Sequence, residues 1–180
     1  MIVGESRRIQ RLAVRREKMK SPNLDYIASM TAQKISEIVG KVLNENGKST
    51  KIVKKDDLEN IATKTLGVLQ TQGIYAAMLF LMSRSGKEGS EDKMSSEERC
   101  ATEIISWLYT LLNPEKFIEN LPRYEDFWPE KKFGEVNASK TEILRVVSEI
   151  TSDLKKLLLV RELWEQILIY VRFHAKAYTI

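Results

Sequence analysis

The residue types most often used for catalysis are scarce in this sequence. It has one histidine, His174, and one cysteine, Cys100. Acid–base catalysis, nucleophilic catalysis and most metal sites need several such groups that converge on one point. We therefore expect no enzyme active site, no metal site and no other cofactor, and we interpret His174 and Cys100 as packed residues of helices.

A partial phosphate-binding motif is also present. Gly47-Lys48-Ser49-Thr50 matches the second half of the loop that binds nucleotide phosphates. The full motif needs a glycine five positions before Gly47, where this chain has Val42, and a preceding strand, where the pattern predicts a helix. These four residues therefore do not predict nucleotide binding.

Positive charge is concentrated at the start of the chain. Residues 1–20 hold seven arginines and lysines against two glutamates, whereas the whole chain has a formal net charge of +4. Four-residue spacing would align several of these cations on one helix, and a guanidinium can bind phosphate through two parallel hydrogen bonds. A solvated helix face or a disordered tail is the alternative, but the predominance of arginine favours contact with nucleic acid. The candidate residues are Arg7, Arg8, Arg11, Arg15, Arg16, Lys18 and Lys20.

Two other basic stretches carry less specific signals. Residues 121–134 form a connector in which aromatic residues alternate with cations, a composition that suits either stacking on unpaired bases or closing one end of a core. It contains Arg123, Tyr124, Phe127, Trp128, Lys131, Lys132 and Phe133. The other stretch contains Lys48, Lys51, Lys54 and Lys55, and the acidic residues that follow offset its charge.

Length and composition predict one helical domain. The chain has 180 residues, 43% of them apolar, which is enough for a single core, and only four prolines and eight glycines. We predict an all-α, single-domain bundle of about five to seven helices over residues 1–180, with residues 1–20 as a basic helix or arm.

The expected compartment is the cytoplasm. A lone cysteine fits a reducing environment, and the N-terminus lacks the apolar core of a secretory signal. The longest nearly apolar run, Gly73 to Met82, is about half of a membrane span. We therefore expect no membrane partner.

Apolar residues recur three and four positions apart in the first half of the chain, the period of one buried helix face. The first such helix should begin after Pro22 and end near Asn46-Gly47. A second should begin with Asp56 and Glu59 as a capping pair and continue into the apolar run Ile74 to Met82, at the centre of the bundle.

Similar patterns predict the loops and helices of the second half of the chain. Residues 83–96 are predicted to be a mobile loop, because they contain one apolar residue. Capping boxes at Ser95/Glu98 and Ser139/Glu142 should open the next two helices. The last helical region should break near Ser152-Asp153, with Asp153 as the N-cap of its second part. Two apolar faces are predicted: Ala101, Ile104, Ile105, Leu108, Leu111 and Leu112, and then Leu157, Val160, Trp164, Ile167, Leu168, Val171, His174, Ala175 and Tyr178.

Two segments of the chain carry a family resemblance. Residues 66–71 (LGVLQT), running into Ala76 to Leu81, are similar to the Gly-apolar-Leu-Gln-Thr helix of the small helical subunit of the type III-B (Cmr) CRISPR RNA-silencing effector complex. Residues 170–177 (YVRFHAKA) are similar to its closing pattern of aromatic, apolar, basic, any, aromatic, Ala, any, Ala. Three positions depart from the family: Gln72 replaces an apolar residue, His174 a Phe and Tyr170 a Trp.

The resemblance implies an all-α bundle without catalytic residues. Such a subunit stacks with copies of itself, beside other subunits of the ribonucleoprotein complex, along guide RNA paired to target RNA. It adds Arg172 and Lys176 to the candidate RNA-binding residues. The function predicted from the sequence is therefore a non-catalytic RNA-binding subunit in antiviral defence.

Two alternatives remain. A helix-turn-helix DNA-binding regulator would place its motif over residues 61–68, but Gly67 lies five residues after Ala62 instead of four, and the later Gln72 should be apolar. A helical adaptor that binds only proteins would leave the arginines incidental.

Overall fold

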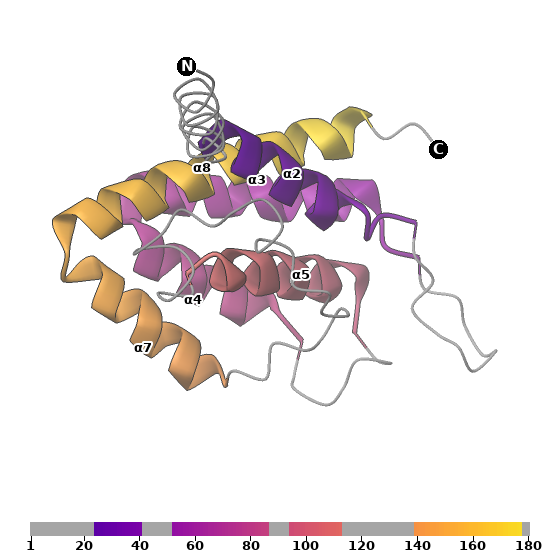
Figure 1. Ribbon diagram of the computed structural model, residues 1–180. Helices are drawn as coiled ribbons and strands as arrows, with labels where there is room; N and C mark the ends of the chain where they lie inside the picture. The colour runs from indigo at the N-terminus through magenta and orange to yellow at the C-terminus, as the bar shows by residue number, and fades with distance from the viewer. Residues whose placement is uncertain (1–23, 41–51, 87–93, 113–138, 178–180) are drawn as a thin grey trace, which may run out of the picture.

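The computed structural model describes residues 24–40, 52–86, 94–112 and 139–177. Over these residues the chain forms an all-α bundle, which confirms the predicted fold class. Its helices are α2 (Leu24–Ser36), α3 (Lys55–Gln72), α4 (Ile74–Arg84), α5 (Ser96–Thr110), α7 (Lys140–Thr151) and α8 (Leu154–Ala177) (Figure 1).

The long helix α8 lies against α2 and α3, and α3 also contacts α4 and α5. Figure 1 shows α2, α3 and α8 together along one side of the bundle, α4 and α5 on the other side, and α7 at one end. The helix α7 packs against α4 and α8, so it closes the bundle at the end where α8 begins.

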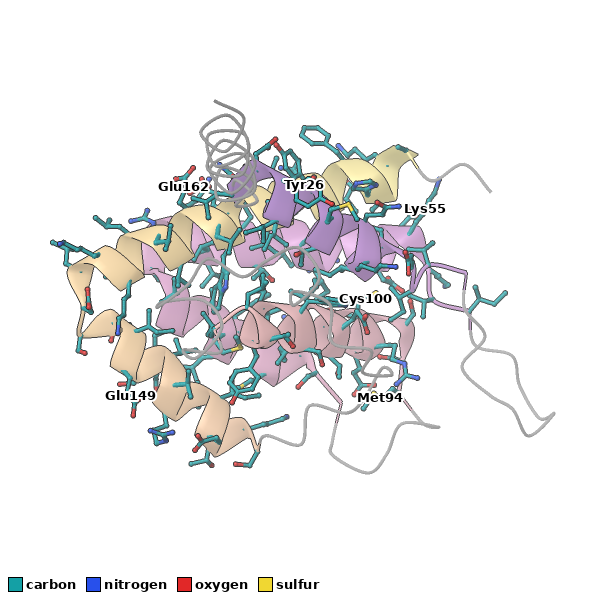
Figure 2. The ribbon with its side chains drawn as sticks, viewed as in Figure 1. Tyr26, Lys55, Met94, Cys100, Glu149 and Glu162 are labelled. Atoms are coloured by element: carbon teal, nitrogen blue, oxygen red, sulfur yellow. The ribbon has the colours of Figure 1, made fainter. Side chains whose placement is uncertain are left out.

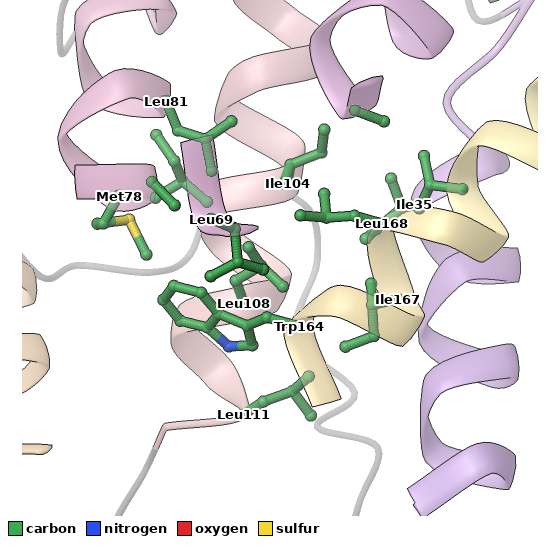
Figure 3. Close-up of a cluster of buried hydrophobic side chains, with 14 of the residues drawn as sticks. Ile35, Leu69, Met78, Leu81, Ile104, Leu108, Leu111, Trp164, Ile167 and Leu168 are labelled. Atoms are coloured by element: carbon green, nitrogen blue, oxygen red, sulfur yellow. The ribbon is translucent and has the colours of Figure 1, made fainter. Parts of the chain in front are cut away.

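The core is made by the apolar faces that the spacing predicts. All six predicted residues of the α5 segment are buried, as are most residues of the predicted α8 face. Leu157 and His174 are only half-buried, and Tyr178 lies outside the described residues. Figure 3 shows the centre of this core, where Trp164 reaches from α8 toward Leu69 and Leu108.

The predicted helix from Pro22 to Asn46-Gly47 is too long. The helix α2 ends at Ser36, whose hydroxyl donates to the Ala32 carbonyl at 2.8 Å. The chain then turns to Gly40, which has a φ of 79°, and the Gly40 N–H donates to the Val53 carbonyl at 3.0 Å. Glycine adopts this left-handed conformation without the cost that other residues incur, so the helix stops before Gly40.

The predicted continuous helix through residues 56–82 is in fact two helices. Gly73 has a φ of 88° and separates α3 from α4; its N–H donates to the Leu69 carbonyl at 3.0 Å. The prediction that this whole segment is central is wrong for α4, because Tyr75 and Leu79 lie exposed on its outer side.

The predicted capping pair of Asp56 and Glu59 is also wrong. The N-cap of α3 is Lys54, and no side chain caps it. Instead, the Lys54 N–H donates to the Ser96 hydroxyl at the start of α5, at 2.9 Å. The start of α3 is therefore fixed by a contact with a residue 42 positions away.

The other predicted helix starts are confirmed. Ser95 and Glu98 form a complete capping box, with both reciprocal hydrogen bonds present. Ser139 accepts from the Glu142 N–H at 3.2 Å, but the Glu142 carboxylate binds Arg145 instead of returning to the cap. The break before α8 is also present.

At that break, Asp153 Oδ1 accepts from the backbone N–H groups of Lys155 and Lys156, at 2.9 and 3.2 Å. This is the N-cap geometry that the sequence predicts for Asp153. The break lets α7 and α8 point in different directions (Figure 1).

The predicted loop 83–96 is shorter than expected. The helix α4 continues to Arg84, and Met94, just before α5, is buried. A side chain at Gly86 would clash with Met94, because an added Cβ would lie 2.6 Å from that side chain. Both described ends of this segment are therefore packed, while residues 87–93 lie outside the described part.

Candidate nucleic-acid interface

Most of the predicted RNA-contacting residues lie outside the described residues. These are Arg7, Arg8, Arg11, Arg15, Arg16, Lys18 and Lys20. The same holds for the Gly47 to Thr50 motif, for Lys48 and Lys51 and for the aromatic connector 121–134. The two remaining candidates, Arg172 and Lys176, lie one helical turn apart near the end of α8.

The helix α8 is rich in cations. It has five lysines and arginines against two glutamates, whereas α5 has one arginine against three glutamates. All five of these cations are exposed or half-buried, so the charge of α8 lies at the surface of the bundle. The structure therefore adds a basic helix to the basic N-terminal segment seen in the sequence.

Polar contacts hold α8 in place on both neighbours. The Tyr170 hydroxyl hydrogen-bonds to Asp25 of α2, which raises the pKa of Tyr170. Toward α3, Gln70 Nε2 donates to Glu165 at 2.5 Å, and Arg161 donates to the Gln70 carbonyl at 3.1 Å. These contacts fix the orientation of α8, so the side chains near its C-terminal end project from a defined surface.

Arg172 is a cation without a partner in the described part of the chain. Its side chain is half-buried, and its Nε atom is buried without a hydrogen bond. No ion pair joins it to any described carboxylate. An unmade hydrogen bond at a buried donor costs about 1–3 kcal/mol. A bound anion would not reach the buried Nε, but it would give the charge of this half-buried side chain a partner.

Lys176 has a partner, but one that it can exchange. Its Nζ lies 3.2 Å from Glu59 Oε1 on α3, and the two side chains are 53% and 32% exposed. Ion pairs at such exposed positions contribute only about 0–1 kcal/mol. A phosphate could therefore replace Glu59 at little cost to the fold.

Phe173, which sequence reasoning did not single out, lies between these two cations along the helix. Its side chain is 61% exposed, although it neighbours the buried Val171 and Ala175. The available signal was its position: residue 173 falls outside the helical spacing of the apolar face. The exposed end of α8 thus combines a guanidinium, an ammonium group and an aromatic ring, which we call the Arg172–Lys176 surface.

The residues considered for catalysis are placed differently. Cys100 is fully buried at the start of α5 (Figure 2), as predicted. Burial, reinforced by the nearby charges of Asp57 and Glu103, raises the pKa of its thiol to about 12. Such a thiol is protonated at neutral pH and is a poor nucleophile.

The described residues hold neither a metal-ligand cluster nor a membrane-spanning helix. Within the described ranges, no group of three or more His, Cys, Asp and Glu side chains could hold a metal ion. His174 is half-buried on α8. None of the helices described combines the length and apolar content that crossing a bilayer requires.

The helix-turn-helix alternative does not fit the structure. Residues 61–68 lie entirely within α3, and Gly67 is an exposed residue in the middle of that helix. The motif requires a turn at its glycine, so that a second helix can enter the major groove.

Comparison of the chain with protein families, with characterised proteins and with solved structures finds no match.

Proposed function

We propose that this protein is a non-catalytic, RNA-binding structural subunit of a ribonucleoprotein effector of the type III-B CRISPR kind, located in the cytoplasm. It contacts guide and target RNA through the Arg172–Lys176 surface and through the basic residues 1–20. The observation that carries the proposal is Arg172, a partly buried guanidinium that has no anionic partner among the described residues.

The chemistry of the surface supports a phosphate backbone as ligand. Arginine and lysine side chains position a strand through its phosphates without selecting its sequence. The resemblance of residues 66–81 and 170–177 to the Cmr small subunit supports RNA, and it also supports copies of this chain and other effector subunits as partners. In this proposal cleavage belongs to another subunit.

The test compares two double variants of the 180-residue chain. Arg172→Gln with Lys176→Gln removes two charges from the Arg172–Lys176 surface. Lys140→Gln with Arg145→Gln removes two charges from α7, which Figure 1 shows at the other end of the bundle. Circular dichroism would check that both variants fold. A third variant with Arg7, Arg11 and Arg15 changed to glutamine tests the N-terminal segment.

RNA affinity would be measured at several salt concentrations. Loss of two phosphate contacts should make the slope of log affinity against log salt shallower by about 1.4 for a single strand. The α7 control should leave the slope unchanged. Unaltered RNA affinity in both the Arg172/Lys176 variant and the N-terminal variant would refute the proposal.

A helical adaptor that binds only proteins is the second candidate. Leu154 and Leu158 support it, because they are 68% and 56% exposed and lie one turn apart at the start of α8. Exposed leucines at helical spacing suit a contact with another protein. A wild-type protein without salt-sensitive RNA affinity would favour this candidate over RNA binding.

A further inference from the structure

Phe173 is exposed on α8 and does not belong to the core of the fold. Its side chain is 61% exposed, and it lies beside Arg172 and one turn before Lys176. The preceding turn contributes Ile169, which is half-buried. The ring therefore rests on a partly apolar base and has cations on both sides along the helix axis.

Another exposed ring shows that this arrangement is not general. Tyr75 on α4 is 40% exposed, next to the exposed Leu79. The cation nearest along that helix, Arg84, is already engaged: it pairs with Glu97 at 3.3 Å and lies over the Phe80 ring at 5.7 Å. Along α4, Tyr75 therefore has no free cation beside it, unlike Phe173 on α8.

We infer that the Arg172–Lys176 surface binds unpaired RNA, with the Phe173 ring stacked on a base and the two cations holding phosphates of neighbouring nucleotides. This inference rests on the proposed function and specifies the form of RNA at that surface. The positive charges favour a polyanion as ligand. The exposed ring adds an aromatic surface on which any of the four bases can stack.

The preference for unpaired over paired RNA follows from access. In an A-form duplex each base is stacked above and below, and the deep, narrow major groove keeps side chains from the base edges. A ring on the convex surface of a helix can reach a base face only where the base is unstacked. Between Arg172 and Lys176 the helix rises about 6 Å, which suits neighbouring phosphates of an extended strand.

The experiment measures binding of the 180-residue chain to two labelled probes by fluorescence anisotropy. One probe is a single-stranded RNA of about 12 nucleotides, within the site size usual for such surfaces, and the other is a blunt RNA duplex of the same length. The variants are Phe173→Ala and Phe173→Leu, and Tyr75→Ala is the control. Leucine keeps an apolar side chain but removes the aromatic ring.

Loss of one stacked base should weaken single-strand binding between about 5-fold and 150-fold. Both Phe173 variants should show this loss of single-strand affinity, while their affinity for the duplex changes less than about twofold. The slope of log affinity against log salt should be unchanged, because no charge is removed. Tyr75→Ala should bind both probes like the wild type. Equal losses on the two probes, or no loss on the single strand, would overturn the inference.

The outcomes also separate this inference from the proposed function. If Arg172→Gln with Lys176→Gln weakens binding but the Phe173 variants do not, the cations bind phosphate without stacking, and only the inference fails. If the wild type shows no salt-sensitive RNA affinity, the proposed function fails and the inference with it. If the Phe173 variants lose single-strand binding but the Arg172/Lys176 variant does not, the ring stacks but the two cations hold no phosphate. The inference as stated is then overturned.

Discussion

The inner and outer faces of α8 both carry an aromatic side chain, but only the one on the inner face is packed in the core. On the inner face Trp164 is 0% exposed and packs with Ile167, Leu168 and Val171, whereas on the outer face Phe173 stands mostly in water. Packing explains every large residue of the inner face. It does not explain Phe173, and an aromatic residue that the fold does not need is a candidate for binding.

The same contrast applies to polar groups. The indole N–H of Trp164 and the Nε–H of Arg172 are both buried without hydrogen bonds in the described part of the chain. The indole is sealed in the core, so no ligand can reach it. Arg172 is only half-buried and lies next to exposed residues, so a bound anion can pair with its charge even though the Nε atom itself is covered.

The largest expected effect is on the inner face. Trp164→Ala should lower the free energy of unfolding by about 3–5 kcal/mol, because it removes a fully buried ring and leaves a cavity. Phe173→Ala should change it by less than about 0.5 kcal/mol, since that ring is mostly exposed. Urea unfolding followed by circular dichroism measures both.

A third variant sharpens this comparison. Trp164→Phe keeps an aromatic ring and removes the N–H that has no partner, so it should cost much less than Trp164→Ala. If Phe173→Ala were as destabilising as Trp164→Ala, the outer face would be part of the core, and the contrast between the two faces would be wrong.

The next effect concerns the reactivity of the Cys100 thiol, which is buried in the fold. Burial raises the pKa of Cys100 to about 12 from a usual value of 9.0, so near pH 8 the native thiol has about a thousandfold less thiolate than an exposed cysteine. Reaction with a disulfide reagent should therefore be slower in native protein by about that factor and return to normal in urea.

The sign of the pH dependence follows from the same shift. Native protein keeps the Cys100 proton that unfolded protein releases above pH 9.0, so this residue's contribution to stability is complete below pH 9.0 and is lost as pH rises toward about 12. Cys100→Ala should show a shallower loss over that window. A native thiol that reacts at the unfolded rate would show that the start of α5 is open.

Local patterns account for the parts of the fold that the sequence predicted. The faces around Ile104 and Trp164 depend only on helical spacing, and the caps at Ser95 and Asp153 depend on residues two or three positions away. Both kinds of signal lie within one short stretch of chain, so they can be recognised without knowing the tertiary structure.

Two of the missed features depend on distant contacts, whereas the break at Gly73, whose N–H donates to the Leu69 carbonyl, is local. Gly40 ends its turn with a hydrogen bond to Val53, and Lys54 begins α3 against Ser96 rather than with the Asp56 cap. At the candidate site, spacing could have placed Phe173 outside the apolar face, but only the structure could show that Arg172 has no partner among the described residues. The partner of Lys176 is more than a hundred residues away, at Glu59.

The smallest expected effect tests how the outer face is held before RNA binds. Glu59→Gln removes the carboxylate that pairs with Lys176, and it should change the free energy of unfolding by less than about 1 kcal/mol because the pair is exposed. It should also strengthen RNA binding between about 1.5-fold and 5-fold, since Lys176 no longer has to leave a partner.

A matched control separates this release of Lys176 from a general change in charge. Glu162→Gln also removes one negative charge, but from an exposed position nearer the start of α8 (Figure 2). It should leave RNA affinity nearly unchanged, because screening limits the reach of exposed charges to about 10 Å. Adding Lys176→Gln to Glu59→Gln should abolish the gain, since the two residues act as a pair. A gain that persists in this double variant would mean that Glu59 repels RNA directly and that Lys176 does not contact it.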